Sequence, residues 1–105
     1  MGEVIAFPAR PRPAVVEAAP LWREAVGGVL RDERRLQERT LADVAGRAGV
    51  SPQHLSEVER GRKEASSEVL EAVSGALGLG LVDLTRRVTR RLEDQSLSGP
   101  VCLAA

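Results

Sequence analysis

The chain has 105 residues, of which 15 are Lys or Arg and 15 are Asp or Glu, so its formal net charge at pH 7 is zero. This length accommodates one compact domain with tails and leaves little room for a deep enzyme pocket. Without a net charge, any surface that attracts a polyanion has to be local. Trp22 and Phe7 are the only aromatic residues, so stacking on unpaired bases is disfavoured and any nucleic-acid partner is expected to be duplex.

Cysteine content and hydropathy bear on the compartment. Cys102 is the only cysteine, which excludes an intrachain disulfide and fits a reducing compartment. No apolar run approaches the roughly 20 residues that span a bilayer, and the N-terminus lacks the pattern of a secretory signal. We therefore expect a cytoplasmic protein with no membrane partner, and a redox role for Cys102 stays open.

The first predicted helix follows a proline-rich segment. Residues 1–20 contain four prolines and are expected to form a flexible tail. Helical periodicity begins at Leu21, and the paired glycines Gly27 and Gly28 within it indicate close packing by a neighbouring helix. The apolar stripe of this helix comprises Leu21, Ala25, Val26, Val29, Leu30 and Leu36.

Two short helices follow, with marked ends. Thr40 is placed to cap a helix over residues 41–48, which Gly49 ends. Ser51 can cap the next helix, because Pro52 then occupies the first position, where a missing amide costs nothing, and Gly61 can adopt the left-handed conformation after its end. The helix over residues 41–48 has an apolar stripe formed by Leu41, Val44, Ala45 and Ala48.

The rest of the chain predicts two more helices. Ser66 or Ser67 caps a helix that runs to about Leu77, and a fifth helix spans residues 81–94. No segment alternates with period two, so the expected fold is all-α. The predicted division is a tail over residues 1–20, a helix-turn-helix domain over 21–80, a dimerisation helix over 81–94 and a flexible tail over 95–105.

Residues 41–60 have the spacing of a helix-turn-helix, since only Gly49-Val50-Ser51 separates the two helices. Ala45 is small enough for the next helix to cross over it, and Leu55 and Val58 can fill the space between the helices. The stretch TLADVAGRAGVSPQHLSEVERG resembles the lambda-repressor-like helix-turn-helix family, also called the xenobiotic-response-element type, and the resemblance covers residues 24–85. A helical bundle that binds no DNA is the alternative.

The resemblance implies that the helix starting at Pro52 enters the major groove. By position, its base-contacting residues are Pro52, Gln53, His54 and Glu57. Gln53 can bond to adenine or a phosphate, His54 can donate to guanine, and Glu57 can accept from the cytosine amino group. We therefore expect C·G pairs in each half-site.

Phosphate contacts are expected around this helix. Many family members have Gln where this chain has Leu41, so that contact is in doubt here. Hydroxyl groups and a local cluster of cations remain available, and an ordinary solvated loop is the alternative for the cluster. These candidates are Thr40, Ser51, Arg60, Arg62 and Lys63.

Catalysis and metal binding are not expected. His54 is the only histidine, and no cysteine stands at ligand spacing from it. The serines lack a partner histidine and carboxylate, so they are read as caps and surface residues. We predict no enzyme activity, no cofactor, no metal and no small-molecule ligand.

A narrower resemblance extends beyond the motif. LWREAVGGVLRDERRLQERTLADVA and HLSEVERGRKEASSEVLEAVSGALG resemble the actinobacterial Clp-protease gene regulators. That resemblance implies a homodimer that binds an inverted repeat in promoter DNA, activates Clp protease and chaperone genes, and is itself degraded by Clp protease. The C-terminal Leu103, Ala104 and Ala105 are the candidate degradation signal.

The fifth helix is the candidate dimer interface. Its apolar stripe of Leu81, Leu84, Val88 and Leu92 exceeds what covering the domain requires, although core packing is the alternative for the first two. A phage-type repressor and an antitoxin-like protein-interaction module are the competing functions. The sequence does not distinguish activation from repression.

Overall fold

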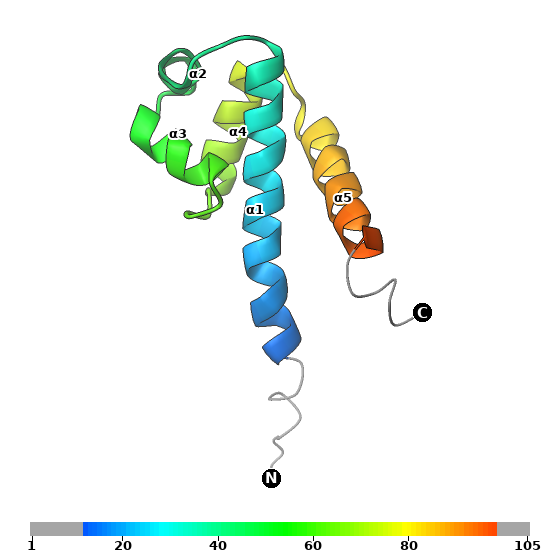
Figure 1. Cartoon of the computed structure of the whole chain (residues 1–105). Coiled ribbons are helices and arrows are strands. Elements are labelled where there is room, and N and C mark those ends of the chain that lie inside the picture. Colours follow the sequence, from blue (N-terminus) through cyan, green and yellow to red (C-terminus); the bar gives the residue numbers. More distant parts are fainter. Residues whose placement is uncertain (1–11, 99–105) are drawn as a thin grey trace.

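The fold is built from helices alone in the part of the chain that is described. The computed structural model describes the backbone of residues 12–98 and the side chains of residues 21–95. Its elements are α1 (Arg12–Leu36), α2 (Leu41–Ala48), α3 (Pro52–Glu59), α4 (Ser67–Ala76) and α5 (Leu81–Ser98). The long α1 runs through the middle, with α2, α3 and α4 on one side and α5 on the other (Figure 1). The predicted all-α, five-helix fold is confirmed.

Local sequence signals set the ends of the short helices. Thr40, Ser51 and Ser66 each accept a hydrogen bond from the backbone amide three residues later, at 3.0, 3.0 and 3.2 Å. Such bonds satisfy amides that the first helical turn leaves without partners. Gly49 and Gly61 have φ angles of 76° and 74°, which a residue without a Cβ adopts without strain. The predicted caps are therefore confirmed.

One hydrophobic core joins all five helices. Val44 and Ala45 of α2 and Leu55 and Val58 of α3 are at most 2% exposed, as the helix-turn-helix spacing predicts. Helix α5 completes the same core with Leu84 and Val88. The remaining buried hydrophobic residues are Ala25, Val26, Val29, Leu30, Val73, Leu77 and Leu79.

The paired glycines of α1 let two other helices approach it closely. A Cβ at Gly27 would lie 2.5 Å from the carbonyl oxygen of Glu59 and would also overlap that of Val58, so the end of α3 rests on the α1 backbone. A Cβ at Gly28 would lie 2.6 Å from the guanidinium carbon of Arg91 in α5. The close packing predicted for these glycines is confirmed, on both sides of α1.

The two long helices extend beyond their expected ends. Helix α1 begins at Arg12, so residues 12–20 are helical where a flexible tail was expected. Pro13 falls in its first turn, where a missing amide is tolerated, and α1 continues through Pro20 although a proline inside a helix removes one hydrogen bond. Helix α5 continues past Asp94 to Ser98, because no glycine or proline occurs before Gly99.

The buried stripe of α1 is shorter than predicted. Leu21 is 49% exposed and Leu36 is 76% exposed. Among residues 21–36 of α1, whose side chains are described, those buried in the core all lie between Ala25 and Leu30. The stripe therefore ends short of both outer leucines, which remain largely in contact with solvent.

Candidate nucleic-acid interface

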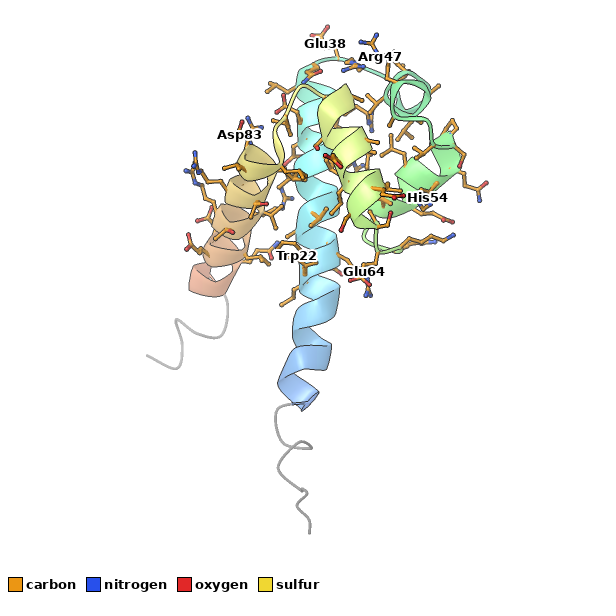
Figure 2. The ribbon with its side chains drawn as sticks, turned by 180° about the vertical axis from the view of Figure 1, so that it is seen from behind. Trp22, Glu38, Arg47, His54, Glu64 and Asp83 are labelled. Atoms are coloured by element: carbon orange, nitrogen blue, oxygen red, sulfur yellow. The ribbon has the colours of Figure 1, made fainter. Side chains whose placement is uncertain are left out.

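Helix α3 is fixed through its inward face and presents polar residues at its start. Leu55, Val58 and Glu59 are buried, whereas Pro52 and Gln53 are exposed. His54 and Glu57 are half-buried. Figure 2 shows His54 on the side of α1 opposite Asp83 of α5. The predicted base-reading residues thus lie on one short helix, on the far side of α1 from α5.

A buried ion pair between Arg34 of α1 and Glu59 of α3 sets the position of α3. Arg34 Nε and Nη2 donate to the two carboxylate oxygens of Glu59 at 2.8 and 3.0 Å. Its Nη1 donates to the carbonyl oxygen of Arg39 at 2.9 Å. The hydrogen bonds with Glu59 raise the pKa of Arg34 above its ordinary value. One guanidinium therefore links α1, the end of α3 and the chain leading into α2.

This ion pair was not predicted from the sequence, although the sequence contains a signal for it. Arg34 follows the buried Leu30 by four residues, and Glu59 follows the buried Leu55 by four. Residues four apart share a face of a helix, so both charges continue a core stripe. Two opposite charges on the buried faces of neighbouring helices favour pairing, because an unpaired buried charge is costly.

The hydroxyl groups predicted to contact phosphate are the caps of α2 and α3. Thr40 accepts from the amide of Asp43, and Ser51 accepts from the amide of His54. A hydroxyl that accepts one bond still has a hydrogen to donate. Both residues are exposed. Each can thus cap its helix and donate to a phosphate oxygen.

The predicted cation cluster lies at the end of α3. Arg60 is the C-cap residue of α3, and Arg62 and Lys63 are exposed in the loop after it. Arg23 Nε of α1 donates to the carbonyl oxygen of Gly61 at 3.5 Å. The structure therefore brings the three cations to one edge of the helix-turn-helix and ties their loop to α1.

The structure corrects the predicted dimer face of α5. Leu84 is 3% exposed and Val88 is fully buried in the core of the same chain, so neither can contact a partner in this conformation. Leu92 is half-buried against that core. Leu81 is 44% exposed and its neighbour Val82 is 68% exposed. A stripe of apolar residues indicates that another surface covers it, and here that surface is mainly α1 of the same chain.

The outer face of α5, which we define by its exposed residues, remains uncovered in the single chain. These residues are Leu81, Val82, Thr85, Arg86, Thr89, Arg90 and Glu93. They combine two aliphatic side chains at the start of the helix with charged groups further along. This face, which includes Leu81 of the predicted stripe, is available to a partner, whereas Leu84 and Val88 are not.

The remaining expectations from the sequence concern residues 102–105, membrane spans and metal binding. Leu103, Ala104, Ala105 and Cys102 lie outside the described residues. Within residues 12–98, every helix is too short or too polar to span a bilayer. The same part of the chain holds no cluster of three or more His, Cys, Asp or Glu residues that could bind a metal ion.

Comparison with known proteins agrees with this architecture. A helix-turn-helix family model matches residues 30–84. The transcriptional regulator ClgR of Mycobacterium tuberculosis H37Rv is 51% identical over 77 residues, which cover 70% of this chain and 69% of the relative. The HTH-type transcriptional regulator DdrOP3 of Deinococcus deserti is 41% identical over 59 residues, covering 56% and 43%.

Solved structures give the same assignment. The crystal structure of the clp gene regulator ClgR from Corynebacterium glutamicum is 38% identical, has a TM-score of 0.73 and covers 79% of this chain and 88% of its own. A second structure of that regulator is 44% identical, with a TM-score of 0.63 and coverages of 67% and 91%. The chain therefore belongs to the ClgR family of helix-turn-helix DNA-binding transcriptional regulators.

Proposed function

We propose that this regulator reads duplex promoter DNA through Gln53, His54 and Glu57 of α3. The observation that carries the proposal is the division of α3 into a buried face, held by Leu55 and Val58, and a polar face at its start. Side chains of these three types can discriminate adenine, guanine and cytosine in the major groove. A half-site that contains C·G pairs follows from Glu57.

The surrounding groups supply contacts to the DNA backbone. Thr40 and Ser51 donate hydroxyl hydrogens to phosphates, and Arg60 and Arg62 neutralise them. Contacts of this kind orient the protein on the duplex and bind every sequence similarly. The absence of a net charge makes this local cluster the main source of electrostatic attraction.

The test separates base reading from phosphate binding. A protein with Gln53, His54 and Glu57 all replaced by Ala should lose sequence preference, and Glu57→Ala alone should weaken cytosine preference at one position by about 1–3 kcal/mol. Arg62→Ala is the matched control, since it should weaken all duplexes alike and flatten the salt dependence. Unchanged base preference in the triple variant would exclude α3 as the reading helix.

We further propose a symmetric homodimer on an inverted repeat, because one short helix contacts too few base pairs to select a promoter. The outer face of α5 is the proposed interface. A Val82→Glu substitution should shift the protein toward monomer in sedimentation, whereas Asp83→Asn, at an exposed neighbour, should not. A Val82→Glu protein that sediments as a dimer would remove this face from the interface.

The proposed targets are Clp protease and chaperone genes, which the protein activates. The related structures from Corynebacterium glutamicum are of a clp gene regulator, which supports this proposal. Genome-wide promoter occupancy, with transcript levels in a deletion strain, tests it. Occupied promoters whose transcripts rise in the deletion strain would indicate repression, the role of the phage-type alternative.

The proposed control of this regulator is its own degradation by Clp protease through Leu103, Ala104 and Ala105. Small, uncharged residues at this position suit an unfoldase that grips chain termini. Replacing both alanines by Asp should lengthen the half-life in cells after translation is blocked, while DNA affinity stays unchanged. Equal half-lives for the two proteins would reject the signal and leave DNA binding intact.

A further inference from the structure

Lys63 lies against the residue that is proposed to read cytosine. Its Nζ is 3.2 Å from Oε1 of Glu57. The backbone brings it there, because the amides of Arg62 and Lys63 donate to the carbonyl oxygen of Glu57 at 2.9 and 3.4 Å. Gly61, with a φ of 74°, turns the chain back over α3. Both the backbone and the side chain of Lys63 are thus directed to one residue.

This ion pair matters more for DNA binding than for folding. The side chains of Glu57 and Lys63 are 29% and 57% exposed, and exposed pairs contribute little to stability. A carboxylate that enters a groove bordered by phosphates is repelled by them, and an adjacent ammonium offsets that repulsion. Lys63 lies against Oε1 of Glu57, and a carboxylate has enough lone pairs to accept from a base as well.

We propose that Lys63 is a positioning residue for Glu57. Lys63 orients and neutralises the Glu57 carboxylate and so sets the preference for cytosine. This inference rests on the proposed function, in which α3 enters the major groove. It gives Lys63 a role that differs from that of Arg62, whose side chain forms no ion pair with the residues that the structure describes. Arg62 contacts phosphates of any sequence, whereas Lys63 acts through Glu57.

The main experiment measures base preference with the full-length protein. Selection from a randomised duplex library gives the preferred site of the wild-type protein. The same selection with Glu57→Gln identifies the base position at which the cytosine preference disappears. This position is then varied in labelled duplexes. Lys63→Met should lower the cytosine preference about tenfold, approaching Glu57→Gln. Lys63→Arg should retain most of it. In the Glu57→Gln background, Lys63→Met should change the preference no further, as expected for residues that act as a pair.

Arg62→Met is the matched control. It should lower the affinity for all duplexes by a similar factor and keep the cytosine preference within about twofold of the wild type. Thermal unfolding of each variant shows whether the fold is retained, and the surface position of both side chains predicts unchanged melting temperatures.

A spectroscopic readout tests the pair without DNA. Lys63 is the only lysine, so reductive methylation with carbon-13 formaldehyde labels its amine and keeps the charge. The Lys63 resonance should move in Glu57→Gln and stay in place in Arg62→Met. A resonance that is unaffected by Glu57→Gln would overturn the pairing in solution.

The outcomes separate this inference from the proposed function. If Lys63→Met weakens all duplexes alike and keeps the wild-type cytosine preference, Lys63 is a phosphate contact and the inference fails while the proposed function stands. A Glu57→Gln protein with full wild-type base preference also overturns the inference. A wild-type protein that enriches no sequence from the library overturns both.

Discussion

Helices α3 and α5 pack on opposite sides of α1, but by different means (Figure 1). Helix α3 rests on the backbone of α1 at Gly27 and is joined to it by the buried pair of Arg34 and Glu59. Helix α5 contributes apolar side chains to the core, and its ion pairs with α1 are partly exposed. The comparison indicates that α3 has a fixed position, whereas the attachment of α5 depends more on solvent conditions.

The largest expected loss of stability comes from breaking the ion pair that attaches α3 to α1. Glu59→Ala removes the partner of Arg34, whose side chain is only 12% exposed, and leaves a nearly buried charge without compensation. We expect a loss of about 3–5 kcal/mol in the free energy of unfolding, measured by urea denaturation. High salt should change this loss little, because buried pairs are screened weakly.

A matched pair of glycine substitutions tests the close approach of α3. Gly27→Ala should cost about 1–3 kcal/mol, because the new methyl group would meet two backbone carbonyl oxygens of α3. Gly46→Ala, in α2, meets no atom within 4 Å and should stabilise the protein by up to about 1 kcal/mol. Similar melting temperatures for the two variants would show that α3 can move away from α1.

The same comparison shows what the sequence could predict. The caps at Thr40, Ser51 and Ser66 and the close packing at Gly27 were predictable, because each depends on residues within a few positions or on the lack of a side chain. These features define the helix-turn-helix and hence the helix that is proposed to read DNA.

Features that depend on distant partners were less predictable. The stripe with Leu84 and Val88 was read as a dimer face, since a pattern of apolar residues does not say which surface covers it. The ion pair of Arg34 and Glu59 was missed, as it joins residues 25 positions apart. The helical start at Arg12 differs from the expected tail, because Pro13 lies in the first turn of α1, where a proline is tolerated, and helix-forming residues follow it.

On the α5 side, Glu33 makes the attachment sensitive to acid. It accepts hydrogen bonds from Gln37 and from Arg87 of α5, at 2.8 and 2.5 Å, and these bonds hold the pKa of Glu33 below its ordinary value of 4.5. A lowered folded-state pKa stabilises the protein above pH 4.5, and the contribution is lost as the pH falls through the folded-state value.

Glu33→Gln tests this dependence. The variant should be less stable than the wild type at pH 7, and the difference between their melting temperatures should narrow as the pH falls below 4.5. Calorimetry across this range measures it. A difference that stays constant from pH 7 to acid would show that the glutamate acts through packing and not through its charge.

The smallest expected loss of stability comes from breaking the exposed ion pair of Arg91 and Asp32. The two side chains are 38% and 66% exposed, and Arg91 Nη1 is 2.8 Å from the Asp32 carboxylate, so solvent screens most of their attraction. Arg91→Gln should cost no more than about 1 kcal/mol at low salt. The loss should shrink as the ionic strength rises, since the screening length falls to about 3 Å at 1 M salt.

Comparing the stability losses of Arg91→Gln and Glu59→Ala then measures how differently α5 and α3 are attached to α1. The guanidinium of Arg91 also covers Gly28, so any loss that remains at high salt reports packing of its side chain on the α1 backbone. Arg31→Gln, at an exposed position of α1, is the control for a change of net charge. If Arg91→Gln destabilised the protein as much as Glu59→Ala and did so at every salt concentration, the two attachments would be equivalent, and α5 would be held to α1 as firmly as α3 is.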